Sequence, residues 1–172
     1  MGINNLLGEG EQPVNRAGPK YLHLVNVYTQ ARTLNTMHRQ PAIAVDCVVF
    51  DNEGWLLLIR RKNAPFKGKY ALPGGFVEYG ESTEAAARRE LQEETSLKVG
   101  QQHLVGVYSE PKRDPRGHVI SIAYVAVATR SAKTRAGDDA ASAEFVAGWR
   151  TLKLAFDHNA IVRDALAVIA AA

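Results

Sequence analysis

The chain has 172 residues, 46% of them hydrophobic and 23% charged, which fits one folded globular domain and is too short for two of ordinary size. The net charge is only +3 and no Lys/Arg block exceeds three residues, which argues against nucleic acid as a partner. No apolar run approaches about 20 residues and no secretion signal opens the chain, so we expect no membrane association and a cytoplasmic location.

The first 40 residues form a preface to the domain. Residues 1–20 are rich in glycine and proline and show little periodicity, which predicts a flexible arm. Residues 21–34 are denser in apolar and β-prone residues, which predicts a strand or an arm that docks on a partner subunit. We therefore expect an N-terminal arm over residues 1–40, a homodimer as one use of it, and a compact domain over residues 41–172.

The domain begins with a strand pattern. The β-prone run 42–51 is followed by turn residues at 51–54 and by a second apolar run at 55–62, which together predict a β-hairpin. Cys47, the only cysteine, lies inside the first run and is expected in the core. A loop and a short extended piece, 71–76, come next.

One polar helix and several strands complete the chain. We expect the helix from Ser82 to about Thr95, capped by Ser82 or Thr83, because its residues are strong helix formers. Residues 97–110 predict a strand pair or one bent strand, 118–129 a clear strand, 131–142 a polar loop and 143–152 a further strand. The end is periodic with one buried face, which predicts a helix capped by Asp157. A mixed sheet between helices fits this order.

The polar helix carries a cluster of acidic side chains. Because each helical residue advances by about 100°, Glu90, Glu93 and Glu94 lie on one face. Arg89 stands beside them, and Glu81 precedes the helix. A solvated helix face explains such a cluster, and so does a set of oxygen ligands for Mg²⁺ or Mn²⁺, which relieve the repulsion between carboxylates.

The spacing of these residues distinguishes the two explanations. From Gly75, five residues intervene before Glu81 and seven more before the Arg89-Glu90 pair, which Leu91, Glu93, Glu94 and Leu97 then follow. This closely resembles the Nudix box, G-x5-E-x7-R-E-U-x-E-E-x-G-U, in which U is a bulky aliphatic residue. The second glycine is Ser96 here, a departure that touches the end of the helix and not the acidic positions. The resemblance covers residues 41 to about 170.

The resemblance implies a fold and a chemistry. Nudix proteins have an α/β/α sandwich with a mixed sheet, and they hydrolyse nucleoside diphosphates linked to another group with the help of Mg²⁺ or Mn²⁺. By position in the box, Glu93 and Glu94 are implied as metal ligands and Glu90 as a ligand or as the base that activates water. Glu81 is implied to support the cluster, Arg89 to orient a glutamate, and the Gly75 carbonyl to offer a further oxygen.

The segment after the box resembles one subgroup of the family. Pro111 lies 15 residues beyond Ser96, a distance similar to that in ADP-ribose pyrophosphatases. Arg113, Arg116 and His118 are candidate donors to phosphate or ribose, and Asp139, next to Asp138, resembles an acidic residue that assists the metals. A solvated hairpin loop and an ordinary turn explain the same residues.

Other side chains near the box are candidates for substrate contact. Arg60 at the hairpin exit, with Arg61 and Lys62, can neutralise phosphate, although a strand end facing water explains them as well. Phe66 can stack on adenine, as can three further aromatic residues, Tyr70, Phe76 and Tyr108, although core packing explains each of them too.

Three functions remain open at this point. The first is hydrolysis of ADP-ribose to AMP and ribose 5-phosphate. The second is a house-cleaning pyrophosphatase for oxidised nucleotides such as 8-oxo-dGTP, which the position of Pro111 disfavours. The third is an ADP-ribose-binding sensor without catalysis, which we do not expect because all box glutamates are present and no DNA-binding segment follows the closing helix. Each takes a small nucleoside diphosphate derivative as its partner.

Overall fold

The computed structural model describes residues 40–128 and 140–171. Its elements are β1 (Ala42–Asp51), β2 (Leu56–Arg61), β3 (Tyr70–Ala71), β4 (Gly74–Phe76), α2 (Thr83–Thr95), β5 (His103–Tyr108), β6 (Val119–Ala128), β7 (Ala140–Val146), the 3-10 helix η1 (Trp149–Thr151) and α3 (His158–Ala171). The predicted N-terminal arm and the acidic pair Asp138 and Asp139 lie outside the described residues.

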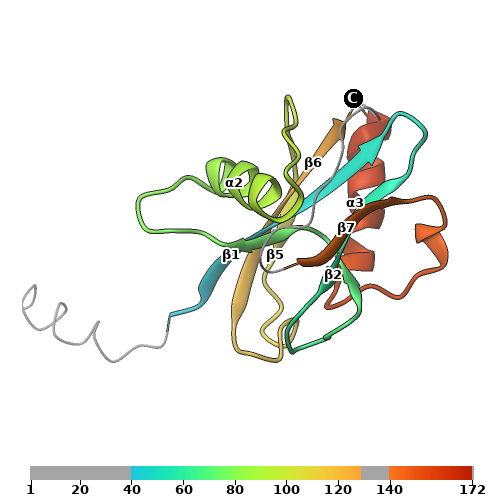
Figure 1. Ribbon diagram of the computed structural model, residues 1–172. Coiled ribbons are helices and arrows are strands. Elements are labelled where there is room, and N and C mark those ends of the chain that lie inside the picture. The colour runs from blue at the N-terminus through green and yellow to red at the C-terminus, as the bar shows by residue number, and fades with distance from the viewer. Residues whose placement is uncertain (1–39, 129–139, 172) are drawn as a thin grey trace, which may run out of the picture. The chain divides into compact units, whose positions relative to one another are not determined.

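The strands form one mixed sheet (Figure 1). Along the sheet the order is β3-β2-β1-β6-β5, with β4 paired to β1 and β7 paired to β2. β1 and β6 are parallel and pair along their full length, from Ala42 opposite Val119 to Asp51 opposite Ala128. The other pairs are antiparallel. The prediction of a mixed sheet is thereby confirmed.

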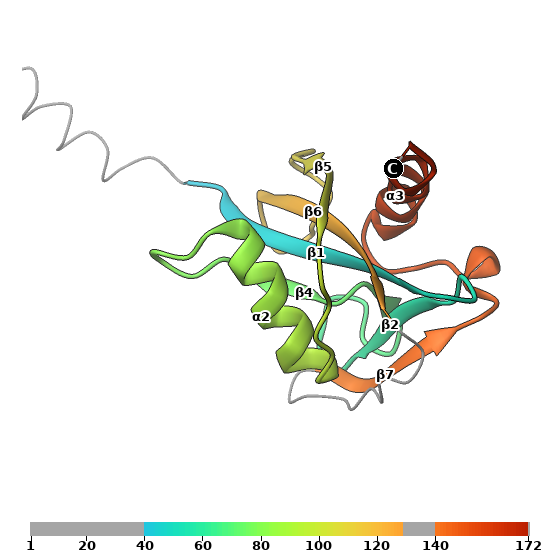
Figure 2. The same cartoon turned by 90° about the horizontal axis from the view of Figure 1, so that it is seen from above.

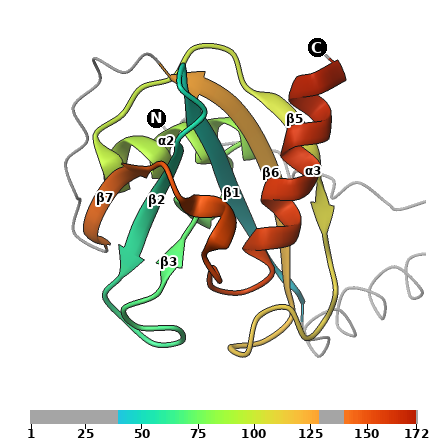
Figure 3. The ribbon, with the colours of Figure 1, turned by 90° about the vertical axis from the view of Figure 1, so that its right-hand side faces the viewer.

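The two helices cover opposite faces of this sheet. α2 lies on one side of β1 and β6 and α3 on the other (Figure 2). Figure 3 shows α3 crossing in front of the strands, with α2 behind them. The predicted α/β/α sandwich is confirmed.

The core follows the alternation of the strands, because successive side chains point to opposite faces. In β1, Val45, Cys47 and Val49 face α2 and pack with Ala86 and Leu91, while Val48 and Phe50 face α3. From Val45 onward β1 is buried on both faces, which explains why its residues are apolar apart from Asp46 and the terminal Asp51.

The caps of α2 follow its sequence. The Ser82 hydroxyl accepts a hydrogen bond from the Ala85 amide at 3.2 Å, and the helix ends at Ser96. Ser96 adopts the left-handed conformation, with φ 59°, where the family pattern has glycine. A side chain in that conformation costs roughly 1–2 kcal/mol. The departure therefore affects how the helix ends and leaves its acidic face in place.

Some element boundaries differ from the predictions. Only 103–108 of the 97–110 segment is a strand, so the strand pair is wrong; the single strand has an irregularity between Leu104 and Gly106 and is shorter than the alternative of one bent strand. β7 begins at Ala140, inside the predicted loop 131–142, and stops at Val146 before the 3-10 turn. The alanine-rich start of β7 has a low β propensity of its own. It forms a strand because it pairs with β2.

Candidate active site

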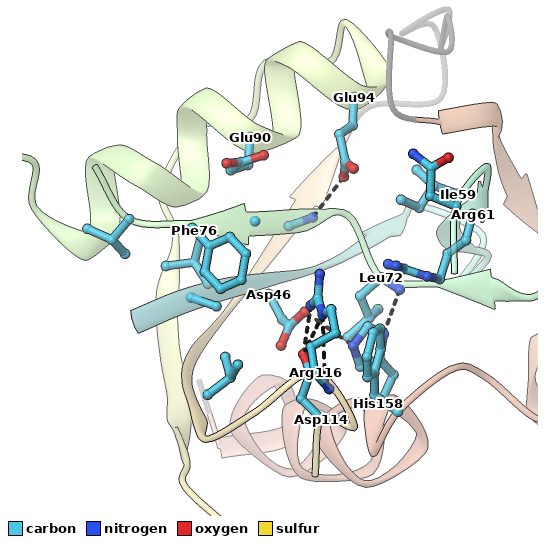
Figure 4. Close-up of a pocket in the computed structure, with 18 of the residues that line it drawn as sticks. Asp46, Ile59, Arg61, Leu72, Phe76, Glu90, Glu94, Asp114, Arg116 and His158 are labelled. Carbon is cyan, nitrogen blue, oxygen red and sulfur yellow. Dashed lines mark hydrogen bonds and ion pairs between the residues drawn. The ribbon is translucent and has the colours of Figure 1, made fainter. Parts of the chain in front are cut away.

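A cavity of about 450 Å³ lies where β1 and β2 separate. The two strands pair near their hairpin, at Phe50 and Leu56, and beyond it β4 takes the place beside β1 while β3 takes the place beside β2. The cavity is lined by β1, the end of β2, β4, α2, the loop between β5 and β6, and the start of α3 (Figure 4). It therefore collects side chains from segments far apart in the sequence.

Two glutamates of α2 reach this cavity. Glu90 and Glu94 line it from the helix side, and Figure 4 shows both pointing from α2 toward β4. The Glu94 carboxylate accepts a hydrogen bond from the Gly74 amide at 2.8 Å. The Glu90 carboxylate lies against Gly75, so closely that a methyl group at Gly75 would overlap it. Gly75 thus makes room for the Glu90 carboxylate, while Gly74 offers its amide to Glu94.

Arg89 joins the remaining acidic residues to this pair. Its guanidinium donates twice to Glu81, at 3.0 and 2.9 Å, and once each to Glu90 at 2.8 Å and Glu93 at 3.1 Å. A further bond reaches the Phe76 carbonyl at 3.0 Å. The hydrogen bonds from Arg89 hold the pKa of the Glu81 carboxyl below its ordinary value. Arg89 is placed to brace Glu81, Glu90 and Glu93.

Burial sets the acidity of Glu90. Removal from water raises the pKa of its carboxyl above the ordinary value, while the hydrogen bond and charge of Arg89 act in the opposite direction. A carboxylate whose affinity for a proton is increased in this way is a stronger general base.

The donor set fits a hard divalent cation. Glu90, Glu93 and Glu94 offer only oxygen, which Mg²⁺ and Mn²⁺ prefer. Within residues 40–128 and 140–171, no three acidic, histidine or cysteine side chains are gathered closely enough to hold a metal as they stand. Arg89 binds one oxygen each of Glu90 and Glu93, Oε1 and Oε2 respectively, so the second oxygen of each carboxylate lies outside these contacts. A cation binding there would draw the carboxylates together against the hold of Arg89.

The opposite wall of the cavity is basic and aromatic. Arg61 and Arg116 both line it, and their guanidinium carbons lie 4.9 and 5.6 Å from the centroid of the Phe156 ring. Arg116 also lies 5.3 Å from the Phe76 ring centroid. The cavity therefore presents the carboxylates of Glu90 and Glu94 on one side, next to Arg89, and the guanidinium groups of Arg61 and Arg116 on the other, where Arg116 is paired with Asp114.

The remaining predicted substrate contacts divide between the cavity and its surroundings. Arg113 and Arg116 line it, whereas Arg60, Phe66, Pro111 and His118 do not. Successive side chains along β2 point to opposite faces, so Arg60 points away from the cavity that Arg61 lines. The guanidinium carbon of Arg60 lies 4.1 Å from the centroid of the Tyr70 ring. Asp139 lies outside the described residues.

Three of these residues, Phe66, His118 and Pro111, lie outside the cavity. Phe66 packs edge-on against Phe156, with ring centroids 4.8 Å apart, so it supports the cavity wall from behind. His118 is exposed and lies 3.3 Å from the Ser109 carbonyl, while Pro111 is exposed in the loop.

A buried polar network closes the bottom of the cavity. The Asp46 carboxylate accepts a hydrogen bond from Ser121 and is paired with Arg113 at 3.4 Å and with His158 at 3.3 Å. Arg113 also makes two bonds to Asp157, at 2.8 and 2.6 Å. Asp157 stands directly before α3, at the predicted cap position, but its side chain binds Arg113 and the helix amides of Ala160 and Ile161 donate to its backbone carbonyl.

Sequence reasoning missed Asp46, His158 and Phe156 as parts of this site. Asp46 carried a signal, since a carboxylate in the middle of an apolar strand must find partners when buried. His158 and Phe156 carried none, because their place depends on how the start of α3 meets β1 and β3.

His158 is held in one neutral form. Its Nδ1 accepts a hydrogen bond from the Leu72 amide at 2.9 Å, which leaves Nε2 to donate to Asp46. Burial lowers the pKa of the His158 imidazole below 6.5. The nearby carboxylates of Asp46 and Asp157 act to raise this pKa. The charges of Arg113 and Arg61 act to lower it further. A proton on Nδ1 would break the bond to Leu72.

We therefore expect the free energy of unfolding to fall as the pH drops below about 6.5, because the unfolded chain binds a proton that folded His158 resists. The slope approaches roughly 1.4 kcal/mol per pH unit for one such group. Urea unfolding from about pH 7.5 to about pH 5.5 measures it. His158→Asn keeps an acceptor for Leu72 and should show a flatter dependence; equal slopes in both proteins would contradict this assignment.

Comparison with known proteins identifies the class. The family model described as NUDIX domain matches residues 40–167. The chain belongs to the Nudix family, and the predicted enzyme class, a Nudix hydrolase, is confirmed.

Two curated relatives and one solved structure carry more specific names. An ADP-ribose pyrophosphatase of Methanocaldococcus jannaschii is 51% identical over 128 residues, which are 74% of this chain and 75% of that protein. The ADPR responsive transcriptional repressor NtrR of Acinetobacter baylyi is 36% identical over 74% of this chain, but the match spans only 54% of the repressor. The NUDIX domain of Shewanella oneidensis NrtR, solved in complex with ADP ribose, superposes with a TM-score of 0.72 at 25% identity and covers 81% of this chain and 98% of that one.

In the part of the chain that the structure describes, no helix is both long and apolar enough to cross a membrane.

Proposed function

We propose that the protein hydrolyses ADP-ribose to AMP and ribose 5-phosphate with the help of a divalent cation, Mg²⁺ or Mn²⁺. The observation that carries this proposal is the two-sided cavity, in which Glu90 and Glu94 face Arg61 and Arg116. A diphosphate with its cation needs both kinds of wall, one to hold the metal and one to hold the phosphoryl charge. The similarity to an ADP-ribose pyrophosphatase at 51% identity supports the choice of substrate.

The acidic helix supplies the residues for the cation and for the attacking water. Glu93 and Glu94 would hold the cation and the Gly75 carbonyl would add an oxygen, while the Glu90 oxygen outside the Arg89 contact is left for the water. The cation supplies Lewis-acid stabilisation of the charge that develops on the diphosphate. Arg89 orients Glu90 and Glu93 through its hydrogen bonds, with Glu81 fixing the guanidinium from the other side.

The water attacks one phosphorus of the diphosphate. A Glu90 carboxylate oxygen accepts the water's proton while the new P–O bond forms and the bridging P–O bond breaks. One phosphate leaves with adenosine as AMP, and the other remains on ribose as ribose 5-phosphate. Arg116 and Arg61 hold phosphate oxygens during this step, and Phe76, which is half exposed at the cavity mouth, offers a face for the nucleobase.

A sensor that binds ADP-ribose without cleaving it is the second candidate. Its support is the similarity to NtrR and to the NrtR domain in complex with ADP ribose. Both candidates bind the same ligand in the same cavity, and they differ in whether the bound diphosphate is cut. The predicted cytoplasmic location and homodimer stay predictions under either candidate.

Release of AMP from ADP-ribose in the presence of Mg²⁺ tests the proposal. ADP-ribose is run beside 8-oxo-dGTP, NADH and other nucleotide sugars, with Mn²⁺ in place of Mg²⁺ and with a chelator as further arms. We expect ADP-ribose to be the best substrate, chelation to abolish its cleavage, and Glu93→Gln to reduce it by about 10²-fold. Preference for 8-oxo-dGTP would favour the house-cleaning enzyme, and tight ADP-ribose binding without cleavage would favour the sensor.

A further inference from the structure

The segment 72–75 places the glycine pair against the acidic helix. It leaves β3 and enters β4, and its last two residues meet α2. The Gly74 amide donates to Glu94 at 2.8 Å, and Gly75 lies against the Glu90 carboxylate. The position of this segment therefore decides where two of the functional carboxylates lie.

A side chain from the other face of the sheet holds the start of this segment. Leu72 is buried, and its amide donates to Nδ1 of His158 at 2.9 Å, a bond that Figure 4 shows. His158 begins α3, which covers the face of the sheet opposite α2 (Figure 2). The next residue, Pro73, accepts a hydrogen bond at its carbonyl from the Cys47 amide of β1, at 2.8 Å. Consecutive residues of the segment are thus bound by α3, β1 and α2 in turn.

Asp46 fixes the orientation of the imidazole. Its Oδ1 lies 3.3 Å from Nε2 of His158, and its Oδ2 accepts a hydrogen bond from Ser121. Asp46 also stands directly opposite Gly74 in the pairing of β1 with β4. Because Nε2 faces a carboxylate, it carries the proton of the neutral ring, and Nδ1 stays an acceptor for the Leu72 amide.

Both ring nitrogens of His158 are therefore engaged. The side chain lines the cavity, but Leu72 binds Nδ1 and Asp46 binds Nε2. Burial lowers the pKa of the imidazole, which keeps Nδ1 free of a proton at neutral pH. The side chain can act on the reaction only through the groups that it holds.

We propose that His158 is a positioning residue of the active site. Through the Leu72 amide it holds segment 72–75 in the place from which Gly74 fixes Glu94 and Gly75 meets Glu90. The first residue of α3 thereby sets the acidic half of the site, which α2 supplies. Groups that orient the ligands of a metal commonly tune the affinity for it. The inference rests on the proposed function for the cation that the carboxylates bind.

Two substitutions at His158 separate its two bonds. By position along the side chain, His158→Asn keeps an oxygen acceptor near the place of Nδ1 and so retains the bond from Leu72. His158→Gln keeps an N–H donor near the place of Nε2 and so retains the contact with Asp46. Only the second substitution should release the segment. Tyr108→Phe is the control, because it removes the hydrogen bond from β5 to Asp164 of α3, at 3.0 Å, and so loosens α3 outside the cavity.

Titration with Mn²⁺ in the absence of ADP-ribose measures the cation site apart from catalysis. The electron paramagnetic resonance signal of free Mn²⁺ reports how much of it is bound. We expect His158→Gln to weaken binding by about tenfold or more, and His158→Asn and Tyr108→Phe to bind as the unchanged protein does. Equal affinities of His158→Gln and His158→Asn, with both folded by circular dichroism, would overturn the proposal.

Amide hydrogen exchange, followed by NMR, gives a second readout that needs no cation. In His158→Gln we expect the amides of both Leu72 and Gly74 to exchange faster than in the unchanged protein, because the segment opens locally. In His158→Asn both amides should keep their protection. Faster exchange at Leu72 alone would mean that His158 does not hold Gly74 in place, and the positioning role would then fail.

The two proposals fail in different ways. Mn²⁺ affinity that depends on His158, in a protein that leaves ADP-ribose uncut, keeps the positioning role and refutes the proposed function. Cleavage of ADP-ribose with the same Mn²⁺ affinity in His158→Asn and His158→Gln does the reverse. If the unchanged protein binds no Mn²⁺, the proposed function fails and exchange at the Gly74 amide decides the positioning role.

Discussion

Replacing Glu94 with glutamine is expected to lower the rate of ADP-ribose cleavage by about 10²-fold or more, which corresponds to ~3 kcal/mol of transition-state stabilisation. The side chain lines the cavity and is fixed by the Gly74 amide at 2.8 Å. A glutamine has the same shape, and its amide oxygen can still accept that hydrogen bond. The fold should therefore survive while the charge that a divalent cation needs is lost.

Glu84→Gln is the matched control. Glu84 lies on the same helix and its side chain is 55% exposed, in an ion pair with Arg88 on the solvent side. Exposed pairs of this kind contribute little, so activity and the unfolding midpoint should both stay close to those of the unchanged protein. Steady-state kinetics over a range of Mg²⁺ concentrations give the comparison. An unchanged rate in Glu94→Gln would remove this carboxylate from the metal site.

The acidic half of the site could be predicted because its geometry is local. A helix fixes the relation of Glu90, Glu93 and Glu94 once their spacing is known, and Ser82 and Ser96 mark its ends where sequence rules place them. Gly75 belongs to the same short motif. Since all of these residues lie within about two dozen positions, no knowledge of the remaining fold was needed.

The basic half could not be predicted in the same way. Alternation along β2 separates Arg60 from Arg61, but it does not say which face of the strand meets the cavity. That choice depends on β4 and α2, which lie on the Arg61 side. Likewise Asp46 signals a buried carboxylate, yet its partners Arg113 and His158 stand 67 and 112 positions away. Such contacts follow from the topology and not from any local pattern.

Adding one methyl group at Gly75 is expected to reduce activity by about 10²-fold with little loss of stability. The methyl would overlap the Glu90 carboxylate, which is the far end of a flexible side chain and can swing aside. The backbone of Gly75 lies outside the left-handed region, so alanine brings no strain there. Only the position of Glu90 and its bond to Arg89 would change.

Gly74→Ala, one residue earlier, is expected to lower stability instead of activity. A methyl group there would overlap the Val45 carbonyl oxygen, which belongs to the backbone of a central strand and cannot move aside. We expect a loss of about 1–3 kcal/mol or more in the free energy of unfolding, and a loss of activity only in proportion to the unfolded fraction. Thermal unfolding and kinetics on the two variants separate the effects.

A double-mutant cycle assigns the effect of Gly75→Ala to Glu90. If the methyl acts by displacing that carboxylate, the variant that combines Gly75→Ala with Glu90→Gln should be no less active than Glu90→Gln alone. If the losses of activity in the two single variants multiply in the double variant, Gly75 acts through another atom, such as its own carbonyl oxygen. A Gly75→Ala protein with near-normal activity would mean that Glu90 works from a position other than the one against Gly75, and the assignment of Glu90 as the base would then fail.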